Sequence, residues 1–253
     1  MKFFKIISAF IGLFSFASFG LADTGLAANT YRATQVSGSA EWQDSTAGQM
    51  QPLVSGQVLP EGAIISTGDV SSVRLVFANG ATAIIGAKSQ VVISKFKQDL
   101  FTDSADLTSG AEPSVSQTEI KLNRGTLSSR VSKLRSQSTY EVQTPVGVAG
   151  VRGTVFEVVY DSVNEILTVL TAEGKVVFST IANQELPVDA GKNIIVYFNV
   201  DESGNIRVSG AETSNAVLTK IKALLALFGL NVDDAGLLVP NLLTRQILSG
   251  DSP

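Results

Sequence analysis

Between residues 31 and 208, apolar and polar positions alternate in short runs that glycine, asparagine and aspartate separate. Within the run 71–78, Val73, Leu75 and Phe77 are apolar at every second position, and a second apolar run at 81–86 follows Asn79-Gly80. A period of two places apolar side chains on one face of a β-strand, and Asn-Gly tolerates the positive φ that a two-residue hairpin turn requires. We therefore predict a β-hairpin here and a fold rich in strands.

Other runs of this kind predict most of the remaining strands. The turn residues 172–174 favour a hairpin over 165–180, and the polar residues 201–204 favour another over 193–208. For residues 31–210 we expect an all-β fold, either a multi-stranded antiparallel β-sandwich or a stacked β-roll or solenoid-like domain. Further strands are predicted at 39–44, 91–93, 119–122, 126–131, 140–143 and 153–160.

Two stretches break this alternation. Residues 97–118 are polar and acidic and contain few apolar side chains. We expect them to form a flexible, exposed loop inserted into the β domain, either passive or acting as a lid over a ligand. From residue 211 to 253 the apolar spacing becomes helical, which predicts a small helical C-terminal appendage.

The apolar stripe of this appendage consists of Ala216, Val217, Ile221, Leu224, Leu225 and Phe228. We predict an amphipathic helix over residues 216–228, ended by Gly229. A helix of this length is marginal in water, so its stripe is expected to pack on the β domain, with a partner or a membrane surface as alternatives. A second helix is predicted from Asp233 to Ile247, with Pro240 interrupting it.

Residues 1–22 have the pattern of a secretory signal peptide. Lys2 and Lys5 form a basic start, an apolar stretch follows, and small residues precede the end at Ala22. We predict cleavage after Ala22 and a periplasmic or secreted mature protein. An uncleaved membrane anchor is the alternative, and only then is a membrane expected as a partner. The sequence leaves the oligomeric state open.

Composition excludes several kinds of chemistry. The chain of 253 residues contains no cysteine and no histidine, which excludes disulfides, thiolate catalysis, zinc sites built on these residues and a Ser-His-Asp triad. The formal net charge is -4 and no basic stripe occurs, which argues against nucleic-acid binding. We expect no cofactor and no metal. Two alternatives to a binding module remain: a hydrolase using carboxylates such as Glu157 and Asp161, and a carbohydrate or cell-wall binding module presenting Trp42.

One segment, residues 144–154, reads TPVGVAGVRGT and concentrates unusual backbone preferences. Proline fixes φ and holds the preceding threonine in extended geometry, while glycine lets the chain turn sharply or approach another segment. Arginine can bind carbonyl groups or a carboxylate with one planar group. The segment is therefore either a structural corner or a ligand or partner site. The candidate residues are Thr144, Pro145, Gly147, Gly150, Arg152, Gly153 and Thr154.

This segment resembles the signature of the FecR-like domain family, in which a TP turn precedes glycines and an RGT sequence that enters an apolar strand. The runs at 56–59, 62–68, 72–77 and 89–93 are similar to the family pattern in the same order, and the resemblance covers residues 58–158. It implies the extracytoplasmic module of a transmembrane signalling system, without the cytoplasmic sigma-regulating domain. We therefore expect a non-catalytic protein-binding, signalling or scaffold module of the bacterial cell envelope, whose partner is an envelope protein of unknown identity.

Overall fold

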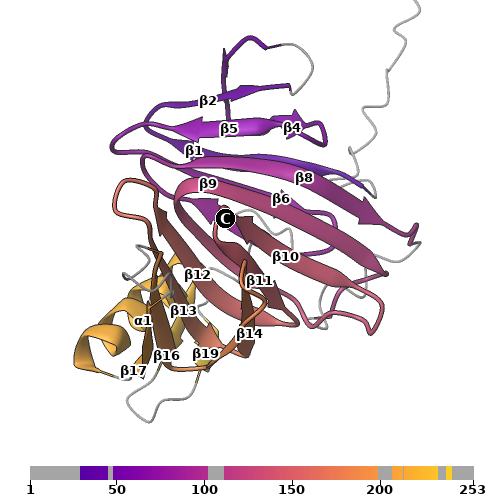
Figure 1. The fold of residues 1–253 in the computed structure, drawn as a ribbon. Coiled ribbons are helices and arrows are strands. Elements are labelled where there is room, and N and C mark those ends of the chain that lie inside the picture. The colour runs from indigo at the N-terminus through magenta and orange to yellow at the C-terminus, as the bar shows by residue number, and fades with distance from the viewer. Residues whose placement is uncertain are drawn as a thin grey trace, which may run out of the picture.

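The structure, a computed structural model, describes residues 29–44, 48–101, 111–198, 207–212, 214–232 and 238–240. Seventeen strands of this described chain form one hydrogen-bonded network that folds into two facing layers, here called sheet A and sheet B (Figure 1). The predicted all-β fold is confirmed.

Sheet A is antiparallel throughout its described strands. Its order is β4 (Val58–Leu59), β1 (Tyr31–Ser37), β6 (Ser72–Phe77), β7 (Thr82–Ile85), the second half of β9, β12 (Thr154–Asp161), β13 (Ile166–Glu173), β16 (Lys192–Tyr197) and β17 (Arg207–Glu212).

Sheet B contains one parallel pair, β9 with β10. Its order is β3 (Gln51–Pro52), β2 (Ala40–Gln43), β5 (Ile64–Thr67), β8 (Gln90–Gln98), the first half of β9, β10 (Thr139–Thr144), β11 (Gly147–Val151), β14 (Lys175–Thr180) and β15 (Glu185–Asp189).

Strand β9 (Ser116–Val131) belongs to both layers. Its first half pairs with β8 and β10, and its second half pairs with β7 and β12. The chain bends at Gly125, where φ is +91° and a Cβ atom would lie 2.6 Å from the Cα of Ser89. The two strands expected at 119–122 and 126–131 are therefore one bent strand. Glycine can adopt the positive φ that the bend requires, so the strand continues through it.

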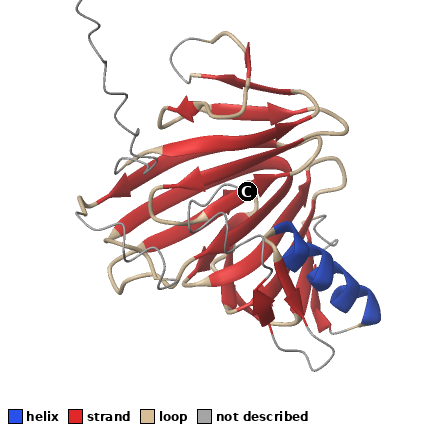
Figure 2. Ribbon diagram, turned by 180° about the vertical axis from the view of Figure 1, so that it is seen from behind, coloured by secondary structure: helices blue, strands red, loops and turns tan. Residues whose placement is uncertain are grey.

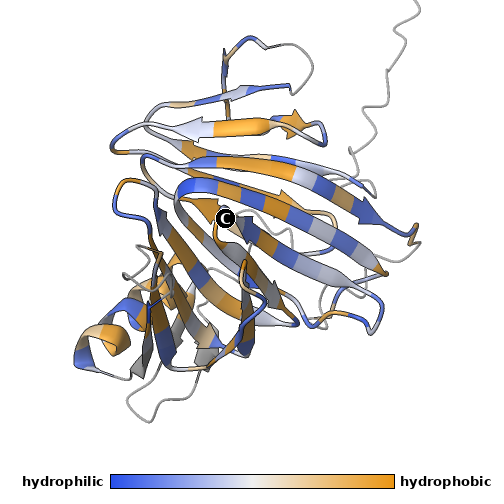
Figure 3. Cartoon of the chain, in the orientation of Figure 1, coloured by the Kyte–Doolittle hydropathy of each residue, from blue (hydrophilic) through white to orange (hydrophobic). Residues whose placement is uncertain are grey.

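The core lies between the two sheets. Tyr31 and Phe77 of sheet A stack with ring centroids 5.3 Å apart, and Phe77 lies 5.1 Å from Phe96 of sheet B. At another point Tyr140 of sheet B meets Phe156 of sheet A edge-on at 6.3 Å. The alternating colours along β9 in Figure 3 show the same period of two that predicted strands. These facing aromatic side chains hold the layers together, each contributing about 1.5–3 kcal/mol on burial.

Helix α1 (Asn215–Leu227) packs on the outer face of sheet A (Figure 2). Ser214 caps its start, since its side chain accepts a 3.3 Å hydrogen bond from the Val217 amide. The buried side of the helix forms a second core with sheet A, so the prediction that this stripe packs on the β domain is confirmed except for Ala216, which is exposed. This second core consists of Ile84, Val155, Leu170, Val217, Ile221, Leu224, Leu225, Phe228 and Leu230.

The second predicted helix is wrong where the structure describes the chain. Strands β18 (Leu230–Val232) and β19 (Leu238–Pro240) pair there as antiparallel neighbours. Pro240 ends a strand, a place where its missing amide hydrogen is tolerated. Residues 233–237 and 241–253 lie outside the described residues.

The hairpin predicted over residues 165–180 is also wrong. Strand β13 belongs to sheet A and pairs with β12 and β16, whereas β14 belongs to sheet B and pairs with β11 and β15. Periodicity identified both strands correctly. Periodicity cannot distinguish a turn that joins two paired strands of one sheet from a connection that carries the chain to the other sheet, because both need the same turn residues.

The loop predicted over residues 97–118 is shorter in the structure. Strand β8 continues to Gln98 and β9 begins at Ser116. Glu112 is 1% exposed and Pro113 and Ser114 are buried, so the expectation of an exposed segment is wrong there. Residues 102–110 lie outside the described residues.

The predicted signal peptide, residues 1–22, also lies outside the described residues. Among the described residues, no helix has the length and apolar character needed to cross a membrane.

Candidate functional site

The segment 144–154 forms the hairpin of β10 and β11 and then carries the chain to the other layer. Thr144 pairs with Gly147 across a two-residue turn that contains Pro145. The Thr144 hydroxyl donates a 2.9 Å hydrogen bond to the Gly147 carbonyl oxygen and accepts one from the Val146 amide at 3.4 Å. The TP turn is thus closed by its own hydrogen bonds.

Two of the glycines are required by close backbone approach. A Cβ atom at Gly147 would lie 2.4 Å from the carbonyl oxygen of Ser179. Gly153 has φ of +90°, and a Cβ there would lie 3.1 Å from the Cα of Lys133. The clash at Gly147 excludes larger residues, whereas at Gly153 the positive φ strains any other residue and the Lys133 Cα leaves little room for a Cβ. These two glycines have a structural role.

Beyond Gly153 the chain enters sheet A at Thr154, which is buried. The Thr154 hydroxyl donates a 3.2 Å hydrogen bond to the carbonyl oxygen of Lys175, at the start of β14 in sheet B. The chain passes from sheet B to sheet A between β11 and β12, and returns to sheet B between β13 and β14. This bond links the two connections. Thr154 is thus a further structural member of the segment.

Gly150 differs from the other two glycines. It lies within β11, opposite Glu141 on β10 and Val177 on β14. Its φ is not positive, and the nearest atom to a Cβ built there is the Val177 carbonyl oxygen at 3.9 Å. Neither backbone geometry nor packing requires a glycine at this position.

Gly150 lies in an open groove of about 440 Å³ on the outer face of sheet B. Arg152 is exposed, and its Nη2 donates a 2.8 Å hydrogen bond to the Ser136 carbonyl oxygen. Lys175 is the first residue of the neighbouring strand β14. Its Nζ lies 3.7 Å from the Asp189 carboxylate, and both side chains are more than half exposed. The groove is lined by Ser138, Thr139, Tyr140, Glu141, Val148, Gly150, Val151, Arg152, Lys175, Val177 and Ser179.

The carboxylates proposed for hydrolysis do not form a catalytic pair. Glu157 accepts a 2.8 Å hydrogen bond from the Ser128 hydroxyl. Asp161 caps a turn by accepting hydrogen bonds from Asn164 and Val163, which hold the pKa of its carboxyl below the usual range. The two residues are four positions apart on one strand, about 13 Å along it, which exceeds the separation that either glycosidase mechanism uses. Among the described residues, no three acidic side chains converge as metal ligands.

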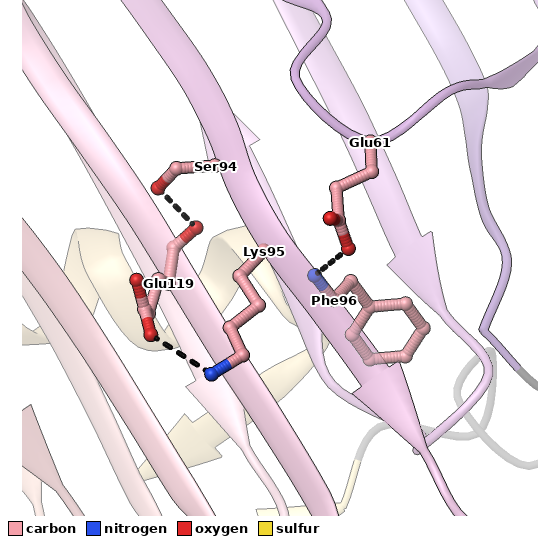
Figure 4. Close-up of polar contacts among 5 residues, drawn as sticks. All are labelled: Glu61, Ser94, Lys95, Phe96 and Glu119. Carbon is pink, nitrogen blue, oxygen red and sulfur yellow. Dashed lines mark hydrogen bonds and ion pairs between the residues drawn. The ribbon is translucent and has the colours of Figure 1, made fainter.

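Two further residues have structural explanations. Trp42 is half-buried against the main core, an unsuitable position for an exposed sugar platform. Ser94 lies at an irregularity in β8, where its hydroxyl donates a 3.0 Å hydrogen bond to the Glu119 carbonyl oxygen (Figure 4). Beside it, Lys95 lies 3.4 Å from the Glu119 carboxylate, and Glu61 accepts a hydrogen bond from the Phe96 amide. These contacts hold β8 in place.

A buried polar cluster around Glu112 was not predicted. Its carboxylate accepts hydrogen bonds from the Ser138 hydroxyl, the Arg135 amide and, at 2.8 Å, the Ser116 hydroxyl. Asn79 donates a 3.0 Å hydrogen bond to the same Ser116 hydroxyl. The cluster fixes the described end of the connection between β8 and β9. A single glutamate in a polar stretch gives no sequence signal of this kind, because its partners come from distant positions.

The segment 144–154 and its two-layer scaffold define a β domain in which a glycine-rich turn carries the chain between sheets. Residues 63–177 match the family model described as FecR protein, which covers the chain from the approach to β5 through the crossing to β14. This match agrees with the family resemblance that the sequence motifs imply. None of the curated proteins compared with the chain matches it.

Two solved structures of a candidate anti-sigma factor from Parabacteroides distasonis ATCC 8503 are similar in shape. Their TM-scores are 0.46 and 0.45, with 16% and 17% sequence identity. Each comparison covers 66% of this chain and 65% of the other, so the chain spans slightly less than two thirds of these neighbours.

Proposed function

We propose that this protein is an exported, non-catalytic FecR-domain module that binds another protein of the cell envelope in a signalling or regulatory pathway. The observation that carries the proposal is the FecR match over residues 63–177, the region that forms the centre of both sheets. The outer face of sheet B supports it, because a groove there is lined by both charged and apolar side chains, among them Arg152, Lys175 and Val177.

Export is the first part of the proposal. The basic start, the apolar stretch and the small residues before Ala22 support cleavage by a signal peptidase. Mass spectrometry of the protein from its native host is expected to find a mature chain beginning at Asp23. A chain that still contains Lys2 and Lys5 would instead support an uncleaved anchor.

Partner binding is the second part. A photoreactive amino acid placed at Lys121, an exposed position of β9 in sheet B, is expected to cross-link one envelope protein in living cells. The matched control is Lys220, on the exposed side of α1. The absence of any cross-linked protein from a series of positions covering both sheets and the helix would contradict a binding function.

A further inference from the structure

We propose that the groove over Gly150 is the partner site, and that it takes a segment of a partner protein presenting a carboxylate side chain beside an apolar residue. This inference rests on the proposed function and adds to it the location and the chemistry of recognition. It divides the segment 144–154 in two: Gly147 and Gly153 build the corner, whereas Gly150 and Arg152 form a binding surface.

Nothing within the fold requires the glycine at position 150. Glycine within a strand weakens it and often marks a place where a ligand or another backbone approaches closely. At Gly147 and Gly153 the fold itself supplies the approaching backbone. At Gly150 the chain supplies none, since the nearest atom to a built Cβ is 3.9 Å away. The space above Gly150 is therefore open to a group from another molecule.

Apolar and cationic side chains surround Gly150 in the groove. Val148 lies two positions before Gly150 on β11, and Val177 lies directly opposite it on β14, so the two form an apolar wall. Val151 of β11 pairs with Val176 of β14. Arg152 directly follows Val151 and Lys175 directly precedes Val176, so two cations lie at one end of the groove. Glu141, opposite Gly150 on β10, is the one acidic side chain among the lining residues, so the carboxylate of a bound segment is expected at the end where Arg152 and Lys175 lie. Its aliphatic stem then contacts the apolar wall.

Arg152 has N–H donors that are not used within the described part of the chain. Its guanidinium group has five N–H donors, and within the described part of the chain it makes one hydrogen bond, to the Ser136 carbonyl oxygen. That bond fixes the planar group and leaves the other donors for a carboxylate. Lys175 is partly neutralised by Asp189 at 3.7 Å, and such an exposed pair is weak enough to rearrange.

The edges of sheet B favour binding on its face. The edge strand β3 has two residues and contains Pro52, and the opposite edge strand β15 contains Pro187. Proline offers no amide hydrogen to an added strand, so both edges resist extension by a partner strand.

The test is a titration of the protein, isotope-labelled in its native host, with two blocked peptides followed by NMR. Acetyl-Val-Glu-Val-Glu-Val-amide is expected to shift the Gly150 amide and the Val148 and Val177 methyl signals in a saturable way. The lysine counterpart, acetyl-Val-Lys-Val-Lys-Val-amide, is expected to leave them unchanged. Equal responses to both peptides, or no response to either, would overturn the proposal.

Gly150→Val provides the decisive variant. Valine fills the groove but suits a strand, so this variant is expected to melt at or above the wild-type temperature and to bind the acidic peptide at least about tenfold more weakly. Arg152→Gln is expected to weaken binding as well, whereas Arg124→Gln, at an exposed position of β9, serves as the control. Wild-type affinity in a folded Gly150→Val protein would overturn the groove as the site.

Cross-linking separates this inference from the proposed function. If the wild-type protein cross-links an envelope protein and Gly150→Val does so equally, the groove is wrong and the binding function stands. If no envelope protein cross-links anywhere, the binding function fails, and the peptide titration still decides whether the groove binds carboxylates.

Discussion

The guanidinium Nη2 of Arg74 donates a 2.7 Å hydrogen bond to the carbonyl oxygen of Leu227, a residue 153 positions further along the chain. Leu227 is the last residue of α1, and its carbonyl group is one of those that a helix end leaves without a partner inside the helix. A cation at this end also interacts favourably with the helix dipole. Partial burial lowers the pKa of Arg74, but the group stays charged at neutral pH.

The first prediction concerns this bond. Arg74→Met keeps the aliphatic stem and removes the donors. The free energy of unfolding is expected to fall by about 1 kcal/mol, because the bond is charged but partly exposed. Hydrogen exchange at the last amides of α1 is expected to accelerate, and Arg124→Met is the control. Equal exchange rates in the two variants would count against a role for Arg74 in holding the helix.

The second prediction compares two leucines of α1. Leu225 is 1% exposed within the second core, whereas Leu218 is 43% exposed. Leu225→Ala is expected to cost about 2–5 kcal/mol in a urea denaturation, and Leu218→Ala about 0.5 kcal/mol or less. Similar losses for both variants would show that the helix is not docked on sheet A as the structure has it.

The third prediction concerns the corner between the sheets. Gly174 has φ of +77°, and a Cβ there would lie 2.4 Å from the Gly153 carbonyl oxygen. Gly153→Val and Gly174→Ala are each expected to lower the free energy of unfolding by about 2 kcal/mol or more, because both combine strain with a backbone clash. Thermal melts of Val148→Ala and Gly150→Ala, expected to cost much less, are the controls. A wild-type melt for Gly153→Val combined with lost partner cross-linking would make Gly153 part of the binding site.

The fourth prediction concerns the buried carboxylate. In Glu112→Gln the new amide group donates where the native oxygen accepted, so one of the contacts to Ser116, Ser138 or the Arg135 amide is lost. The expected cost is about 1–3 kcal/mol. Limited proteolysis is expected to cut the variant faster near residue 112. Glu119→Gln is the control, since it loses only an ion pair with Lys95 that is worth at most about 1 kcal/mol. Equal stability of the two variants would contradict the importance of the cluster.

The fifth prediction concerns alkaline pH. Burial raises the pKa values of Tyr31 and Tyr140 above the usual value near 10, and the Glu61 carboxylate adds to the effect at Tyr31. Above about pH 10 the unfolded chain therefore releases tyrosine protons that the folded chain retains, and stability falls as pH rises. The melting temperature is expected to fall more steeply in the wild type than in the double variant Tyr31→Phe, Tyr140→Phe. Parallel declines would show that other groups dominate.

Much of the local structure could be predicted from the sequence. The period of two identified the strands, and Asn79-Gly80 located the hairpin between β6 and β7. The helical spacing after Ser214 predicted α1 within one residue at each end. Within the segment 144–154, sequence reasoning left a structural corner and a partner site as alternatives. Local geometry assigns Gly147 and Gly153 to the corner, while Gly150 has no such role.

Side-chain periodicity and turn chemistry are local properties, and so the sequence by itself determined where most strands and α1 lie, although it predicted a helix where β19 lies. Beyond the hairpins of β6 with β7 and of β16 with β17, only the tertiary structure decided which strands are neighbours. It made β9 one bent strand shared by both sheets, and it placed β13 and β14 in different layers. It also brought Ser116, Arg135 and Ser138 around Glu112, and Arg74 to the end of α1. These contacts join residues that are distant in sequence, and their energy depends on packing and hydrogen bonding across layers, which no local pattern encodes.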